Sequence, residues 1–136
     1  MVSSLISTKG NLTVGLHIFK RDAAYLTGED NNALEFNKRG GIGCISVTAN
    51  VAPKLCSELQ NSSMSKDLNL QKRAKEINDL LTPLHKALFI ESNPSPVKYA
   101  ASLLGMCKPT VRLPLVEIRD ETKKKVSDAL KVAKLL

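Results

Sequence analysis

Histidine and cysteine are the side chains best suited to nucleophilic or metal chemistry, and this chain has few of them. Neither His17 nor His85 has a carboxylate or a cysteine at the spacing of metal ligands. The cysteines lack CxxC spacing and have no cluster of Lys or His beside them that would lower a thiol pKa; they are Cys44, Cys56 and Cys107. We expect His85 to lie on a helix surface or to pack, and the cysteines to be buried free thiols in a reducing cytoplasm. We expect no metal and no cofactor.

A glycine-rich string over residues 40–43 superficially resembles a phosphate-binding loop. Phosphate loops open a helix, because the free N–H groups at a helix N-terminus bind the anion. Here the string precedes a β-branched, apolar run over residues 42–48, so its context does not fit a phosphate site. Ser46 lies in that run and sits in no nucleophile elbow. Both features therefore indicate a strand rather than phosphate or serine chemistry.

The elements that would position these residues alternate in the first half of the chain. Two strands and two helices are predicted there, at residues 23–27, 32–39, 42–48 and 51–59. The strand runs are short and apolar, as in parallel strands covered on both faces. Asp30 or Asn31 can cap the first helix. This alternation is typical of an α/β protein.

The second half of the chain has a helical pattern. Apolar residues recur at steps of four and three over residues 67–89, which predicts a long amphipathic helix. Another helix is predicted over 97–104. A last helix, capped by Asp120, is expected to bury Val126, Ala129, Leu130 and Ala133. We therefore divide the chain into a region of βα units, residues 1–62, and a helical region, residues 63–136.

Composition limits the classes of function. The chain has 136 residues and 43% hydrophobic side chains, enough for a compact core. Its charge of +7 is dispersed apart from Lys123–Lys125, and with 4% aromatics and no Trp it offers little for stacking on bases. We expect no nucleic-acid partner. The chain has no apolar run of membrane-spanning length and no secretory signal over residues 1–15, so we expect a cytoplasmic location and no membrane.

Five strings occur in order along the chain. They are LTGED (26–30), GGIGCISVTANV (40–51), PLHKALF (83–89), NPSPVK (93–98) and RLPL (112–115). Together they resemble the C-terminal portion of the 4-hydroxy-tetrahydrodipicolinate synthase family, within the N-acetylneuraminate lyase superfamily, over nearly the whole chain. The resemblance implies a partial (β/α)8 TIM barrel, comprising its last strands and helices, followed by a C-terminal helical bundle. A complete barrel needs about 250 residues, so 136 residues cannot close one.

The resemblance also implies a reaction. In the family, a lysine near the end of the sixth strand forms a Schiff base with pyruvate, and the resulting enamine attacks aspartate semialdehyde in lysine and diaminopimelate biosynthesis. Matching the family pattern places Ile6 where that lysine belongs, and Lys9 comes three residues later. We interpret Lys9 as a surface lysine, because an activated lysine needs a desolvated or positively biased pocket. No catalytic residue is therefore expected in this chain.

Two residues match family positions that line the pyruvate pocket. Gly28 follows the seventh strand, where a glycine lets a ligand approach closely, and Ile45 lies in the eighth strand and supplies an apolar wall. The alternatives are a strand-ending turn for Gly28 and barrel core for Ile45. Glu29 and Asp30 are expected on the same rim.

Two functions remain open from the sequence. The first is a lyase of this family, truncated and inactive alone, with a complementing N-terminal chain or further copies in a homo-oligomer as partners. Pyruvate is the ligand expected of an intact family member. The second is a noncatalytic remnant or protein-interaction module. Whether the chain is an enzyme stays undecided at this point.

Overall fold

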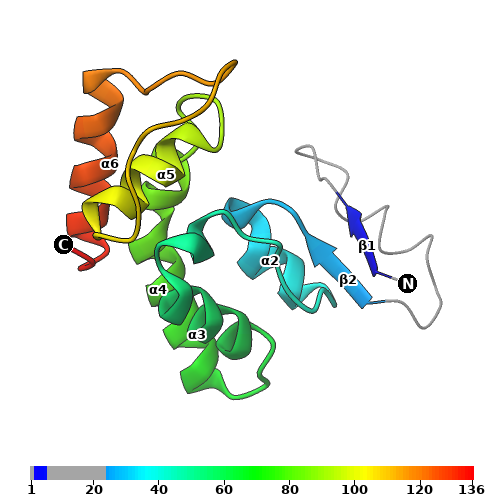
Figure 1. Cartoon of the computed structure of the whole chain (residues 1–136). Helices are drawn as coiled ribbons and strands as arrows, with labels where there is room; N and C mark the ends of the chain where they lie inside the picture. The colour runs from blue at the N-terminus through cyan, green and yellow to red at the C-terminus, as the bar shows by residue number, and fades with distance from the viewer. Residues whose placement is uncertain (1, 6–23) are drawn as a thin grey trace. The chain divides into compact units, whose positions relative to one another are not determined.

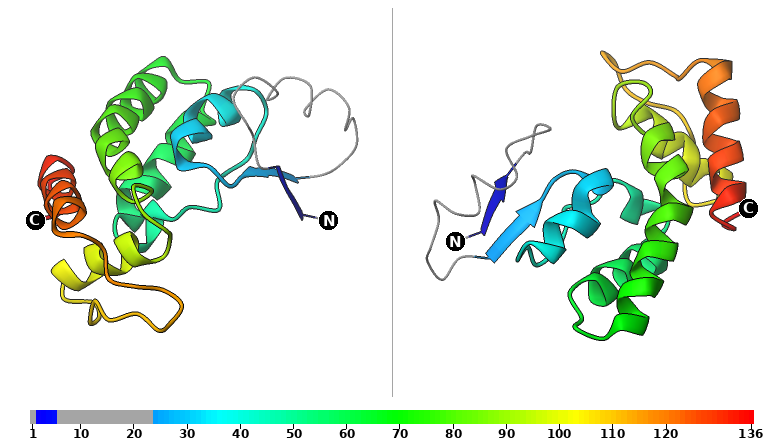
Figure 2. Two further views of the ribbon diagram at one scale, coloured as in Figure 1. Left: turned by 90° about the horizontal axis from the view of Figure 1, so that it is seen from above. Right: turned by 180° about the vertical axis from the view of Figure 1, so that it is seen from behind.

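The structure, a computed structural model, describes residues 2–5 and 24–136 (Figures 1 and 2). The described part is mostly helical, with one short pair of parallel strands. Across residues 2–5 and 24–136, no helix has both the length and the apolar character needed to cross a bilayer.

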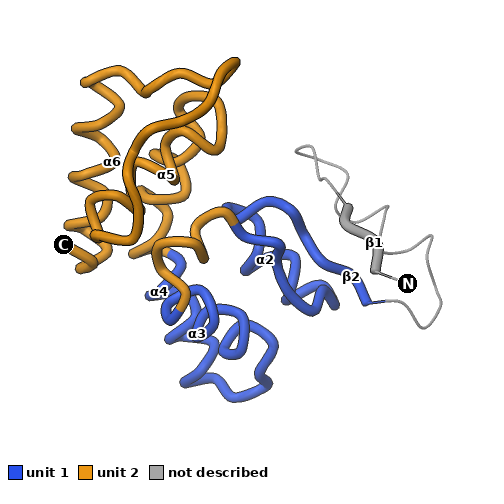
Figure 3. Tube along the Cα trace, in the orientation of Figure 1, with its two compact units in different colours: residues 1–46, 54–78 blue, residues 47–53, 79–136 orange. Residues whose placement is uncertain are grey.

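Internal contacts divide the chain into two compact units that interleave in sequence (Figure 3). Unit 1 comprises residues 1–46 and 54–78, and unit 2 comprises residues 47–53 and 79–136. Our division at residue 62 rests on a different criterion, the change from βα units to helices, and it stays a prediction.

The strands of unit 1 run parallel. Strand β1 (Val2–Leu5) pairs with β2 (Ala24–Thr27), so that Leu5 lies opposite Thr27. The extended segment 42–45 lies along the other edge of β2, through a parallel bridge between Thr27 and Cys44. The strand predicted over 42–48 is therefore too long. Its last residues turn instead into the 3-10 helix η2 (Thr48–Asn50), where the Asn50 side chain donates to the carbonyl of Val47 at 2.9 Å.

Three helical elements complete the core of unit 1 beside the 3-10 helix η1 (Asp30–Asn32). They are α2 (Ala33–Lys38), α3 (Pro53–Ser63) and the part of α4 (Leu68–Ala87) that precedes residue 79. Their buried apolar side chains are Ala33, Leu34, Phe36, Cys56, Leu59, Ala74 and Ile77. The side-chain amide of Asn37 ties α2 to α3 by donating to Gln60 Oε1 at 2.6 Å and to Ser63 Oγ at 2.8 Å. A Cβ at Gly41 would overlap the ring of Phe36, so only glycine lets the chain leave α2 this closely.

Unit 2 is helical. It contains η2, the end of α4, α5 (Ser95–Leu103) and α6 (Asp120–Val132), and α5 packs against both α6 and η2. Its fully buried side chains include Leu81, Leu84, Leu88, Val126 and Leu130. The predicted burial of one face of α6 is confirmed. The predicted cap is wrong, because Arg119 precedes α6 without a side-chain cap, and Asp120 in the first turn accepts from Lys123 at 3.1 Å instead.

Candidate functional site

The two residues predicted to bind substrate lie at the carboxyl ends of neighbouring parallel strands of unit 1. We call this region, with the loop over residues 27–30 and Ser46, the strand edge. Gly28 directly follows β2, and Ile45 ends the extended segment beside it. The backbone N–H of Ile45 donates to the carbonyl of Thr27 at 2.8 Å, so the carboxyl ends of the two strands are in register. The side chain of Ile45 is 56% exposed, and Gly28 is exposed as well. Ile45 is therefore not part of the core that this chain builds for itself.

Nothing in the described part of the chain requires a glycine at position 28. A Cβ built there would meet no heavy atom within 4 Å, and Gly28 is not among the glycines with positive φ. The absent side chain thus leaves open space at the carboxyl end of β2. Such space is what a ligand or another chain segment needs for close approach to the backbone.

The loop after β2 is held by its own polar side chains. Thr27 is fully buried, and its Oγ1 accepts from the backbone N–H of Glu29 at 3.1 Å. Glu29 in turn accepts from the backbone and side-chain nitrogens of Asn31, at 3.4 and 3.1 Å. Glu29 therefore caps η1, and α2 begins after Asn32 without a side-chain cap. The prediction that Asp30 or Asn31 caps the helix expected over residues 32–39 is wrong. The reason is that the carboxylate of Asp30 turns inward.

Asp30 is the centre of a buried polar cluster that sequence reasoning missed. Its side chain is 4% exposed, and Ser46 Oγ donates to its Oδ1 at 2.5 Å. The thiol of Cys44 lies 3.9 Å from the same oxygen, and Ser46 Oγ lies 3.9 Å from Cys56 Sγ. These four residues, hereafter the Asp30 cluster, join the loop after β2 to the end of segment 42–45 and to α3. They connect the carboxyl ends of the strands, where Gly28 and Ile45 lie, to α3.

The thiols of the Asp30 cluster are not activated. Burial, and secondly the negative charge of Asp30, raise the pKa of Cys44 to about 12. Burial also raises the pKa of Cys56 to about 11, although the hydrogen bond from Ser46 lowers that pKa in part. Both thiols are therefore protonated at neutral pH and are poor nucleophiles.

The prediction of buried free thiols is confirmed only in part. All three cysteines are free, and Cys56 is buried. Cys44 is half-buried, and Cys107 is exposed, which contradicts the prediction. Its sequence neighbour Met106 is itself 58% exposed, so apolar neighbours in the sequence did not imply burial at this position.

The remaining candidates lie elsewhere. His85 is 1% exposed, and its Nδ1 lies 2.7 Å from Thr48 Oγ1 within unit 2, so it is a packing residue and not a helix-surface residue. Lys9, Ile6 and His17 lie outside the described residues. Among the residues that the structure describes, no group of three or more His, Cys, Asp and Glu is placed to hold a metal ion.

Known proteins resemble this chain in sequence and in fold. Residues 2–133 match the Dihydrodipicolinate synthetase family. The 4-hydroxy-tetrahydrodipicolinate synthase of Pelagibacter ubique is 56% identical over 115 residues, which cover 85% of this chain and 39% of that protein. The dihydrodipicolinate synthase structure from Thermotoga maritima has a TM-score of 0.85 at 35% identity, over 98% of this chain and 46% of that one. The structure of the chloride-inhibited dihydrodipicolinate synthase from Acinetobacter baumannii, complexed with pyruvate, has a TM-score of 0.85 at 34% identity. The match covers 96% of this chain and 45% of that one.

These matches confirm the resemblance that the five strings carry. They extend over nearly the whole chain, whereas the chain spans about two fifths of the length of the Pelagibacter protein. Sequence identity above half over 115 residues, together with a match over residues 2–133, leads to one conclusion. The chain belongs to the dihydrodipicolinate synthetase family.

Proposed function

We propose that this chain forms part of a 4-hydroxy-tetrahydrodipicolinate synthase-type lyase, and that Gly28 and Ile45 line its pyruvate pocket. One observation carries the proposal. The hydrogen bond from Ile45 N–H to the carbonyl of Thr27 sets the carboxyl ends of two parallel strands side by side, with Gly28 and Ile45 both exposed there. In a (β/α)8 barrel, substrate sites lie at this end of the strands. The solved relative from Acinetobacter baumannii that is complexed with pyruvate supports the choice of ligand.

In this proposal, residues 1–62 contribute βα units to a barrel and residues 63–136 form a helical region beside it. The parallel order of β1, β2 and segment 42–45 supports it, since successive barrel strands are parallel neighbours. The backbone bonds of segment 42–45 to other described strands all go to β2. No described strand pairs with its outer edge, so we propose that a further strand pairs there, because an open edge is a template for pairing with another chain.

Each pocket residue has a simple role in this proposal. Gly28 leaves room for pyruvate at the end of β2, because no side chain occupies that space. Ile45 covers one side of the ligand with an apolar wall and excludes water from it. The Asp30 cluster holds the two strand ends in position through hydrogen bonds that join them to each other and to α3. None of these groups is an amine that could form an imine with pyruvate, and Ile6 stands where the family has its Schiff-base lysine. We therefore assign no catalytic residue to these 136 residues and expect them to be inactive alone.

Activity then depends on a partner. We propose a complementing N-terminal chain that supplies the Schiff-base lysine and pairs with the open strand edge. A homo-oligomer, in which copies cover that edge, would bury it without restoring activity. The proposed location is the cytoplasm, and lysine and diaminopimelate biosynthesis is the proposed pathway. Nucleic acids and membranes are not proposed as partners.

A noncatalytic interaction module is the second candidate. The observation that favours it is the exposure of Ile42 and Ile45, at 51% and 56%, at the two ends of segment 42–45. Exposed apolar side chains on an edge strand favour association with another protein surface. This candidate predicts binding without any effect of pyruvate.

Borohydride trapping separates the two candidates. Pyruvate and a lysine amine condense to an imine with loss of water, and borohydride delivers a hydride that reduces the imine to a stable secondary amine. We expect no adduct on the folded chain alone, by intact mass. Adding the N-terminal portion of the Pelagibacter synthase should give an adduct on the added portion, and Ile45→Asp should abolish it. An adduct on Lys9 of the chain alone would overturn the inactivity proposal, whereas stable association without any adduct would favour the interaction module.

A further inference from the structure

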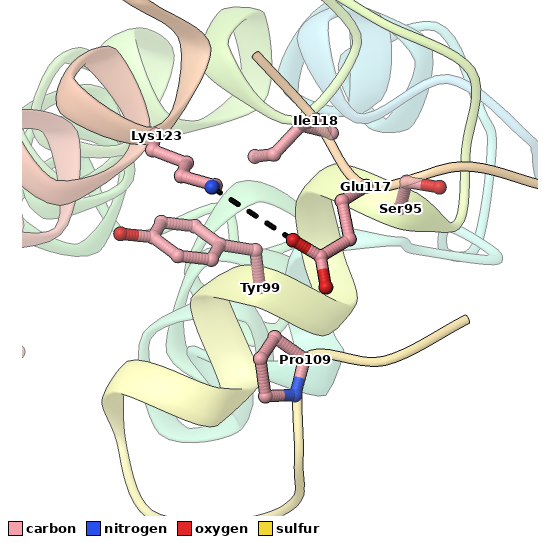
Figure 4. Close-up of a pocket in the computed structure, with 6 residues that line it drawn as sticks. All are labelled: Ser95, Tyr99, Pro109, Glu117, Ile118 and Lys123. Carbon is pink, nitrogen blue, oxygen red and sulfur yellow. Dashed lines mark ion pairs between the residues drawn. The ribbon is translucent and has the colours of Figure 1, made fainter. Parts of the chain in front are cut away.

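Unit 2 contains a pocket that the lyase proposal does not use. It encloses about 300 Å³ between α5, the connection that follows α5, and the first turn of α6 (Figure 4). A volume of this order is at the small end of the range for ligand sites. The pocket is lined by Ser95, Tyr99, Pro109, Glu117, Ile118 and Lys123. All six residues belong to unit 2, so the pocket is complete within one unit.

One part of the pocket is apolar. Ile118 is 4% exposed, and the half-buried ring of Tyr99 lies across from it (Figure 4). Pro109 adds a third apolar surface. Ser95 shapes the wall rather than offering a free donor, because its Oγ donates to the carbonyl of Val116 at 3.0 Å. This part can take a small hydrocarbon or aromatic body.

The other part of the pocket is charged. Lys123 Nζ lies 3.1 Å from Asp120 Oδ1 and 3.9 Å from Glu117 Oε2. These contacts raise the pKa of Lys123, first through its hydrogen bond with Asp120. Figure 4 shows Lys123 and Glu117 pointing toward one another beside the ring of Tyr99. Two carboxylates thus lie within 3.9 Å of one ammonium, although basic side chains outnumber acidic ones in the whole chain.

Glu117 is the group with capacity for a further donor. Its side chain is 60% exposed, and its 3.9 Å separation from Lys123 is a loose contact compared with the 3.1 Å contact between Lys123 and Asp120. A carboxylate accepts several hydrogen bonds, so Glu117 can accept from a ligand while Lys123 stays with Asp120. An anionic ligand would instead have to compete with two carboxylates for the same ammonium.

We propose that this pocket binds a small organic cation, a primary or secondary ammonium carried on an apolar body. Glu117 would accept its N–H groups, the face of Tyr99 would attract its charge, and Ile118 with Pro109 would cover its body. An ammonium near an aromatic ring and a carboxylate gains from both, because the ring face is electron-rich. The proposal is independent of the lyase function, since it uses no residue of unit 1.

The test compares two ligands that share one body. Phenethylamine and phenylacetate are titrated into the full chain while the Ile118 methyl and Tyr99 ring signals are followed by NMR. We expect saturable shifts at both residues with the amine, and binding of phenylacetate that is weaker by about fivefold or more, as for loss of one partly exposed ion pair. Equal or tighter binding of phenylacetate would overturn the proposal. Amine-induced shifts that spare Ile118 and Tyr99 would do so as well.

Matched variants locate the effect. Glu117→Gln keeps the shape of the pocket and should weaken the binding of phenethylamine by about threefold to fivefold. Glu121→Gln, on the exposed face of α6, should leave that affinity unchanged. Lys123→Met removes the competing cation and should strengthen amine binding. Equal weakening by both glutamate variants would indicate a general charge effect and contradict the site. A fall in amine affinity for a folded Lys123→Met chain would contradict it independently of the glutamate variants.

Discussion

The strand edge of unit 1 and the helical core of unit 2 bury opposite kinds of side chain. At the strand edge, Thr27 and Asp30 are buried at 0% and 4% exposure, while Ile45 is 56% exposed. In unit 2, Leu84 and Leu130 are fully buried. The helical unit thus stabilises itself by apolar packing, as an ordinary core does. At the strand edge, by contrast, the buried side chains are polar and hydrogen-bonded, and an apolar side chain is exposed. This arrangement is expected of a surface that a ligand or another chain segment covers.

The largest expected effect comes from the helical core. Leu130→Ala removes a fully buried side chain from α6 and should lower the free energy of unfolding by about 3 kcal/mol, through lost burial and the cavity left behind. Val132→Ala on the same helix is the control, because Val132 is 51% exposed and its truncation should change stability by less than about 0.5 kcal/mol. Urea unfolding followed by circular dichroism measures both. Equal losses for the two variants would mean that α6 is not packed as described.

The helices were the part of the fold that the sequence predicted well. The helix predicted over 67–89 is observed at Leu68–Ala87, and the buried face predicted for the last helix is observed on α6. A helix encodes its buried face locally, because residues three and four apart share one side. The errors in the helices were confined to their ends. Asp120, for example, was expected to cap the backbone of the last helix, but its carboxylate accepts from Lys123 instead.

The strand edge could be predicted only in outline. Gly28 and Ile45 were chosen from the family resemblance, and the structure places both at the carboxyl ends of neighbouring parallel strands. Their role in lining a pocket stays a prediction. The Asp30 cluster could not be predicted, because Asp30 and Ser46 are sixteen residues apart in different elements and no local pattern pairs them. An aspartate beside a strand end has two common roles, helix cap and buried acceptor, and the sequence alone does not distinguish them.

The second prediction concerns the polar core of the strand edge. Asp30→Ala removes the acceptor of Ser46 Oγ and should lower the free energy of unfolding by about 2 kcal/mol, the range for a buried hydrogen bond to a charged group. Asp79→Ala, at an exposed position of α4, is the matched control and should stay within about 0.5 kcal/mol. Thermal and urea unfolding of both chains measure the difference. If Asp30→Ala were neutral or stabilising, the cluster would not hold the strand ends.

The third prediction is a pH dependence confined to the strand edge. Because folding raises the thiol pKa of Cys44 to about 12 and of Cys56 to about 11 from a usual value near 9.0, the folded state favours the protonated thiols. Their stabilising effect is complete below about pH 9 and is lost as the pH rises through the folded pKa values. Stability should therefore fall above about pH 9, and less so in a chain in which both cysteines are replaced by alanine.

Alkylation tests the same thiols directly. Iodoacetamide at neutral pH should modify the exposed Cys107 first, and Cys44 and Cys56 much more slowly, because a thiolate is the reacting species. Asp30→Ala should speed the reaction of Cys44 only modestly, since burial is the larger cause of its raised pKa. Peptide mapping by mass spectrometry gives the order. Modification of Cys44 or Cys56 before Cys107 would contradict the described burial.

The smallest expected effect is the most informative about the strand edge. Ile45→Ala should change the free energy of unfolding of the chain by less than about 0.5 kcal/mol, because its side chain is already 56% exposed. The same change in a buried isoleucine, Ile77→Ala in α4, should cost about 3 kcal/mol. Urea unfolding of the two variants compares them within unit 1. A loss above about 1 kcal/mol for Ile45→Ala would mean that Ile45 belongs to the chain's own core, and the pocket-lining role proposed for it would then lose its physical basis.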